Sequence, residues 1–65
     1  MELDSEYNNI IIEKQKYPVI FGYSNGLYNM TTTLPCCKNI IHATGITINQ
    51  TFENLKIVYN NQLTN

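Results

Sequence analysis

The amino-acid sequence predicts a small α+β domain, in which an antiparallel sheet of about five strands carries one short helix in the order β-β-β-α-β-β. Three observations lead to this fold class. They are an Asn-Gly dipeptide between two alternating runs, further runs rich in β-branched residues, and helix start and stop signals around residues 35–44. The chain of 65 residues has room for a single domain, 1–65. An all-β domain is the alternative if residues 35–44 form a strand.

The first strand is expected over residues 9–15, after a polar N-terminal arm at residues 1–7. Three isoleucines follow one another in this strand: Ile10, Ile11 and Ile12. Such β-branched residues favour extended backbone, and three in succession indicate burial on both faces or an edge that pairs with another chain. Tyr17-Pro18 is expected to break the strand, because proline has no N–H to donate.

Asn25-Gly26 predicts a β-hairpin with a two-residue loop, because both residues accept the positive φ of a type I′ turn. This loop fixes the register: Ser24 opposite Leu27, Tyr23 opposite Tyr28, Phe21 opposite Met30, and Val19 opposite Thr32. Side chains alternate between the two faces, so one face carries the larger ones: Val19, Phe21, Tyr23, Tyr28 and Met30. We expect this face to be covered, either by the helix as part of the core or by a partner protein.

The short helix is expected over residues 35–44, capped by Thr33 and ended by Gly45. Its apolar residues recur at helical spacing: Cys36, Cys37, Ile40, Ile41 and Thr44. Lys38, Asn39 and His42 would then point outward. This stripe is the best internal cover for the large hairpin face.

Two more strands are expected at residues 45–49 and 55–59, joined by a loop over 50–54 and followed by a polar tail at 60–65. A helix over residues 51–63 is the alternative. The residues that favour the helix are Phe52, Leu55, Tyr59 and Leu63, with Thr51 as a cap. The β-branched run at Ile57-Val58 favours the strand.

Charge and composition exclude several classes of partner. The net charge is −1, arginine is absent, and the lysines are scattered: Lys14, Lys16, Lys38 and Lys56. Nucleic-acid binding depends on a basic stripe and on arginine, so none is expected. The acidic N-terminus resembles no signal peptide, and no apolar run is long enough to span a membrane. We therefore expect a cytoplasmic protein that binds neither nucleic acid nor membrane.

Cys36, Cys37 and His42 are the only residues whose types suggest chemistry. Adjacent cysteines close almost no loop, so a stabilising disulfide between them is not expected. Along a helix, His42 would lie too far from either thiol to act as its base. One cysteine pair and one histidine are also too few for a zinc site within one chain. We expect no enzyme activity and no cofactor; the alternative is a thiol-dependent protein, or a metal site that these residues share between copies.

The function that these observations favour is a small, non-enzymatic protein-binding module. A chain this short has little core of its own, which favours a homo-oligomer or a subunit of a larger assembly. The residues expected to contact the partner are Ile10, Ile11, Ile12, Phe21, Tyr23 and Tyr28. Residues with A/T-rich codons dominate the composition, which favours a phage- or virus-encoded accessory protein that inhibits a host protein.

Overall fold

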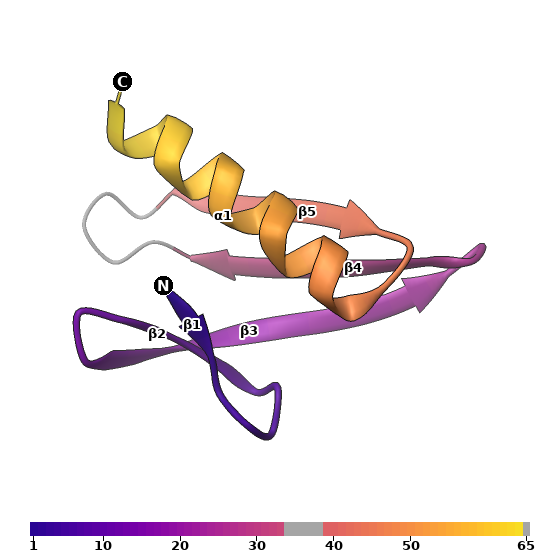
Figure 1. Ribbon diagram of the computed structural model, residues 1–65, viewed down its shortest axis with the longest axis horizontal. Coiled ribbons are helices and arrows are strands. Elements are labelled where there is room, and N and C mark those ends of the chain that lie inside the picture. Colours follow the sequence, from indigo (N-terminus) through magenta and orange to yellow (C-terminus); the bar gives the residue numbers. More distant parts are fainter. Residues whose placement is uncertain (34–38, 65) are drawn as a thin grey trace.

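A computed structural model describes residues 1–33 and 39–64 as an antiparallel sheet of five strands followed by one helix (Figure 1). The elements are β1 (Glu2–Leu3), β2 (Asn9–Ile12), β3 (Gln15–Ser24), β4 (Leu27–Thr33), β5 (Ile40–Gly45) and α1 (Ile48–Thr64). The strands lie in the sheet in chain order, each antiparallel to the next. The predicted α+β class is therefore confirmed. The predicted order is wrong, because the helix follows all five strands.

The β3–β4 hairpin has the predicted register. Ser24 lies opposite Leu27, Tyr23 opposite Tyr28, Phe21 opposite Met30, and Val19 opposite Thr32. Asn25 and Gly26 have φ angles of 55° and 79°, the positive values that a type I′ turn requires at both central residues. The turn alone was therefore sufficient to set which side chains share a face.

A second two-residue turn divides the stretch that was predicted as one strand over 9–15. Ile12 pairs with Gln15 across the turn, and Glu13 and Lys14 have φ angles of 51° and 69°. Residues with a Cβ adopt this left-handed conformation less readily than glycine, so Glu-Lys carries no turn signal in the sequence.

The prediction that Tyr17-Pro18 breaks a strand is wrong, because β3 runs through both residues. The Val19 N–H donates to the Asn8 carbonyl at 3.0 Å on the β2 side. Neighbouring residues of a strand turn their main-chain groups to opposite sides, so the Pro18 nitrogen faces the β4 side. The pairing of β3 with β4 begins only at Val19. In this register Pro18 would lie opposite Thr33, so its missing N–H ends the ladder between β3 and β4 without interrupting β3.

The N-terminal arm predicted at residues 1–7 includes a strand and an ordered loop. Leu3 in β1 pairs with Ile10 in β2. In the loop that follows, one carboxylate oxygen of Asp4 accepts the N–H groups of Asn8 and Asn9, at 3.0 and 3.3 Å. Its other oxygen accepts the Asn9 side-chain amide at 3.1 Å. Asp4 thus closes the loop between β1 and β2.

The stability of this loop should depend on pH. The Asn9 side-chain amide, the N–H groups of Asn9 and Asn8, and the charge of Lys16 together hold the pKa of Asp4 below its usual value of 3.8. A lowered pKa in the folded state gives stability that is present above the unfolded-state pKa and is lost as the pH falls through the folded-state pKa. Asp4→Asn does not titrate there. We therefore expect Asp4→Asn to have a lower free energy of unfolding than the wild type at about pH 7. This difference, measured by urea unfolding, should shrink as the pH falls to about 2.5. A gap that stays constant with pH would contradict this role of Asp4.

The helix predicted over residues 35–44 is wrong for its second half, which forms β5; residues 34–38 lie outside the described part of the chain. Burial alternates along β5, with three inward residues: Ile41, Ala43 and Gly45. They lie opposite Thr32, Met30 and Tyr28 of β4. Pairing with β4 thus prevails over the helical stripe, in which two of the five residues were Cys36 and Cys37.

Helix α1 replaces the strand predicted at 55–59 and includes most of the predicted polar tail, so the alternative helix over 51–63 is confirmed. The strand predicted at 45–49 is also wrong, because Gly45 ends β5 and α1 begins at Ile48. Thr47 caps it: the Thr47 hydroxyl accepts the Gln50 N–H at 3.0 Å, and the Gln50 side chain accepts the Ile46 N–H at 2.7 Å. A threonine followed three residues later by glutamine is a helix-start pattern. The sequence interpretation overlooked this pattern.

The core lies between α1 and one face of the sheet, mainly under β4 and β5 (Figure 1). Its buried residues come from five elements: Ile10, Val19, Met30, Ile41, Ala43 and Leu55. Leu55 from the middle of the helix is fully buried. Val19 and Met30, two residues of the large hairpin face, thus share a core with Leu55 of α1, whereas the sequence interpretation expected a helix over 35–44 to cover this face.

Candidate functional site

Helix α1 covers only part of the large hairpin face. Val19 and Met30 are buried in the core, whereas Phe21 and Tyr28 are half-buried and Tyr23 is 63% exposed. The helix begins at Ile48, so it does not extend over the end of the hairpin near the Asn25-Gly26 turn (Figure 1). The hairpin face thus belongs partly to the core and partly to an open surface.

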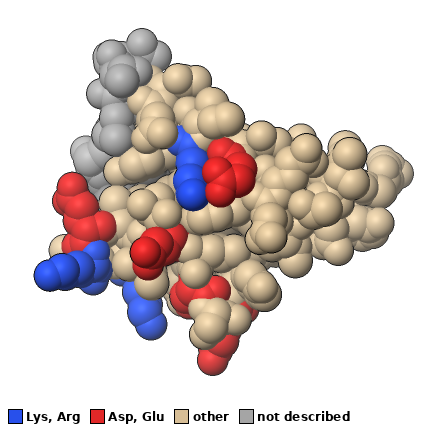
Figure 2. Space-filling view, viewed as in Figure 1, with Lys and Arg blue, Asp and Glu red and all other residues tan. Residues whose placement is uncertain are grey.

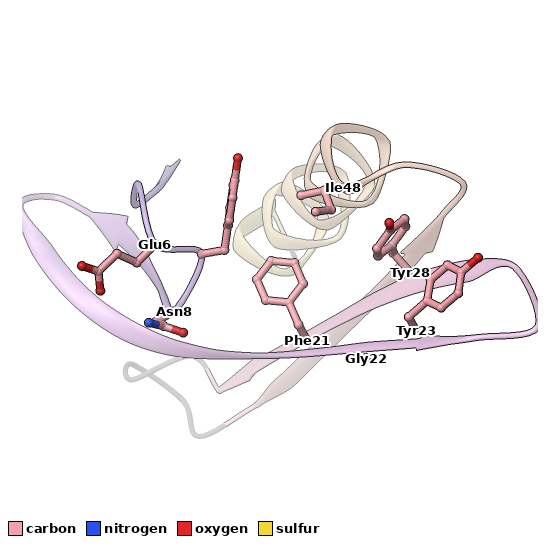
Figure 3. A pocket seen from close by; sticks show the side chains of 8 residues that line it. Glu6, Asn8, Phe21, Gly22, Tyr23, Tyr28 and Ile48 are labelled. Atoms are coloured by element: carbon pink, nitrogen blue, oxygen red, sulfur yellow. The ribbon is translucent and has the colours of Figure 1, made fainter.

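This open part is one side of a groove of about 430 Å³ (Figure 3). Eight residues from four segments line it: Glu6, Tyr7, Asn8, Phe21, Gly22, Tyr23, Tyr28 and Ile48. The volume lies within the range of about 300–1,000 Å³ that is typical of binding pockets. We call this feature the aromatic groove, because four of its side chains are aromatic.

The rings of the aromatic groove contact one another in two pairs. Tyr23 and Tyr28 lie with their ring centroids 4.7 Å apart, and Tyr7 packs edge-to-face on Phe21 at 6.2 Å. Tyr7 has a φ of 59°, a left-handed conformation that is uncommon for an aromatic residue, and it is 48% exposed. The β1–β2 loop therefore holds a tyrosine over the groove at some conformational cost.

The end of the molecule that contains the groove has very little charge. No Asp, Glu, Lys or Arg lies between Lys16 and Lys38, or between Lys38 and Glu53. In Figure 2 the narrow end, where the β3–β4 hairpin extends, shows no charged side chain on the visible face. Leu27 is also exposed at this end, on the opposite face of the sheet from Tyr28. Depletion of charge together with enrichment in tyrosine is typical of the central part of a protein interface.

The structure brings together only three of the six predicted partner-binding residues, namely Phe21, Tyr23 and Tyr28. Ile10 is fully buried, and Ile11 and Ile12 are half-buried. The expectation that the three isoleucines form an exposed edge is wrong, because β2 lies between β1 and β3. Their apolar character is explained by packing within the sheet, where Ile12 contacts the core.

Sequence reasoning missed Tyr7 and Ile48, which come to the groove from the β1–β2 loop and from the start of α1. Neither position carries a local signal for such a role, since each reaches the groove only through the tertiary fold. The signal that could have located this end of the molecule is the long uncharged run on both sides of Lys38.

The residues of the thiol or metal alternative are only partly placed. Cys36 and Cys37 lie outside the described residues. His42 lies exposed in β5, opposite Thr31 of β4, on the sheet face that α1 leaves uncovered. Within residues 1–33 and 39–64, no three side chains of His, Cys, Asp or Glu gather closely enough to hold a metal ion. The part of the chain that the structure describes also includes no helix with the length and hydropathy to cross a membrane.

Comparison with known proteins leaves the groove as the principal guide to function. No family model, no curated protein and no solved structure matches this chain.

Proposed function

We propose that this chain is a non-enzymatic protein-binding module, and that the aromatic groove is its binding surface. The observation that carries the proposal is the cluster of four aromatic side chains in an open groove at an end of the molecule that is nearly free of charge. Tyrosine gives a large contact area at a small loss of conformational entropy, and its hydroxyl group tolerates both water and a partner. Tyr23 is the central residue of this proposal, because most of its side chain is exposed and it packs on Tyr28.

A binding role for the groove also explains why these aromatic side chains are not fully covered by the rest of the chain. A domain of this size has little apolar surface to spare for its own core. The face that contains Phe21, Tyr23 and Tyr28 could be buried by a longer helix, yet α1 begins at Ile48 and leaves Tyr23 exposed and the other two half-buried. A partner that occupies the groove would bury aromatic area that folding alone does not bury.

Truncation of Tyr23 should remove binding without removing the fold. The ligands are peptides selected from a random library displayed on phage, with the wild-type chain as bait and their affinities measured by fluorescence polarisation. Tyr23→Ala is expected to weaken binding by about tenfold or more, as truncation of a central interface tyrosine does. Its thermal unfolding midpoint should stay close to that of the wild type, because the side chain is mostly exposed.

Ile20→Ala is the matched control for Tyr23→Ala. Ile20 lies in the same strand, is 70% exposed and faces the opposite side of the sheet. This variant should bind the selected peptides as the wild type does. If no peptide prefers the wild type over Tyr23→Ala, or if both variants lose binding equally, the groove is not the binding surface.

A further inference from the structure

The main chain of β3 has an open edge beside the aromatic groove. β2 pairs with β3 only from Gln15 to Pro18, and Figure 1 shows β1 and β2 beside the first half of β3 alone. Beyond Pro18, the Val19 N–H donates to the Asn8 carbonyl on this side. Alternate residues of a strand turn their main-chain groups to the same side, so Phe21 and Tyr23 also present theirs away from β4. No strand of the described chain pairs with these two residues on that side.

We propose, resting on the function proposed above, that the groove binds an extended segment of a partner protein as an additional strand. This strand would lie beside β3, in line with β2, and would exchange main-chain hydrogen bonds with Phe21 and Tyr23. Strand addition of this kind obtains affinity from the main chain and specificity from pockets that take every second side chain. Here the pockets are already formed, because the side chains of Phe21 and Tyr23 line the groove next to that edge.

The charges of the groove define the partner segment further. Glu6 is the only carboxylate that lines it, and none of the described lysines (Lys14, Lys16 and Lys56) does so. Figure 3 shows Glu6 and Asn8 on one side of Phe21, and Tyr23, Tyr28 and Ile48 on the other. A segment with apolar side chains against the tyrosines and a lysine or arginine near Glu6 complements this arrangement.

Hydrogen exchange of single amides, followed by NMR, tests the open edge and the added strand. In the free chain, the amides of Phe21 and Tyr23 should exchange rapidly. Those of Ile20 and Gly22 should exchange slowly, because they face β4. Addition of a peptide that prefers the wild type over Tyr23→Ala should slow the exchange of Phe21 and Tyr23 by about tenfold or more, at a peptide concentration about tenfold above its Kd. The amides of Ile20 and Gly22 serve as the internal reference.

The charge complement is tested with the same peptides. They should be enriched in lysine or arginine. Glu6→Gln should weaken their binding by about threefold, as expected for an exposed ion pair. Glu13→Gln is the control, because it removes the same charge in the β2–β3 turn and outside the groove.

Each other outcome overturns a defined part of the proposal. If the peptides need Tyr23 but leave the amides of Phe21 and Tyr23 unprotected, the added strand is wrong and the protein-binding function stands. If Glu6→Gln and Glu13→Gln weaken peptide binding equally, the proposed lysine or arginine of the partner near Glu6 is wrong. If sedimentation shows a dimer whose Phe21 and Tyr23 amides are protected without peptide, the occupant is a second copy and the partner segment is wrong. If no peptide depends on Tyr23, the proposed function and the added strand are both wrong.

Discussion

Replacement of Leu55 by alanine is expected to lower the free energy of unfolding by about 2–5 kcal/mol, the range for removing a fully buried leucine side chain. Leu55 has no exposed surface and lies in the core with residues from β2 to β5. A domain of this length has an unfolding free energy of about 3–10 kcal/mol in total. Leu55→Ala should therefore lose a large share of the stability of the domain. Urea unfolding followed by far-UV circular dichroism measures the loss.

Ile57→Ala is the matched control for Leu55→Ala. It removes a side chain of similar size from the same helix, but Ile57 is 58% exposed. Alanine also has a higher helix propensity than isoleucine, so the free energy of unfolding of this variant should lie within about 0.5 kcal/mol of the wild-type value. Equal losses in the two variants would mean that α1 does not pack on the sheet through Leu55.

The sequence was informative about the fold where the local and the tertiary preferences agree. Asn25-Gly26 determines both a turn and a register by itself, and the whole β3–β4 pairing follows from it. Glu13-Lys14 forms a comparable turn with residues that do not favour it, so its conformation depends on the strands on either side. Such a turn is set by pairing across the sheet, which the local sequence does not record.

Two of the wrong secondary-structure predictions have a shared cause. Residues 40–44 were predicted as part of a helix, and residues 55–59 as a strand, on patterns of only a few apolar positions. Ile57 and Val58 have β-branched side chains, but the burial of Leu55 and Thr51 on one side of a helix outweighs their preference. A short apolar run fits both the period of a helix and that of a strand, so tertiary packing decides which of the two forms.

The candidate site was predictable only in its β-hairpin part. Phe21, Tyr23 and Tyr28 share a face because of the register, and their exposure depends on where α1 begins. Tyr7 and Ile48 join them from positions far apart in the chain. The edge of β3 is open because β2 pairs only with the first four residues of β3, and this pairing follows from the turn at Glu13-Lys14, which the sequence does not signal.

The junction between β5 and α1 should be unusually sensitive to a single methyl group. A Cβ at Gly45 would lie 2.7 Å from both the main-chain nitrogen and the hydroxyl oxygen of Thr51. Thr51 cannot move away easily, because it is fully buried and both of these atoms donate to the Thr47 carbonyl, at 2.9 and 2.7 Å. Gly45→Ala must therefore displace the first turn of the helix from the sheet. We expect a loss of about 1–3 kcal/mol in the free energy of unfolding, the cost of an overpacked core.

Gly22→Ala is the control for Gly45→Ala. It tests whether alanine destabilises the strands at any glycine position or only where α1 approaches Gly45 closely. At Gly22 the atoms that a Cβ would meet belong to the side chain of Asn29, the nearest at 2.6 Å, and this side chain can rotate away. Alanine also reduces the conformational freedom of the unfolded chain, which favours the folded state by about 0.4–1 kcal/mol where the backbone accepts it. Gly22→Ala should thus unfold near the wild-type urea midpoint while Gly45→Ala unfolds well below it. If Gly45→Ala is as stable as Gly22→Ala, then α1 does not approach β5 as closely as the structure shows, and the start of the helix, which bounds the aromatic groove at Ile48, lies elsewhere.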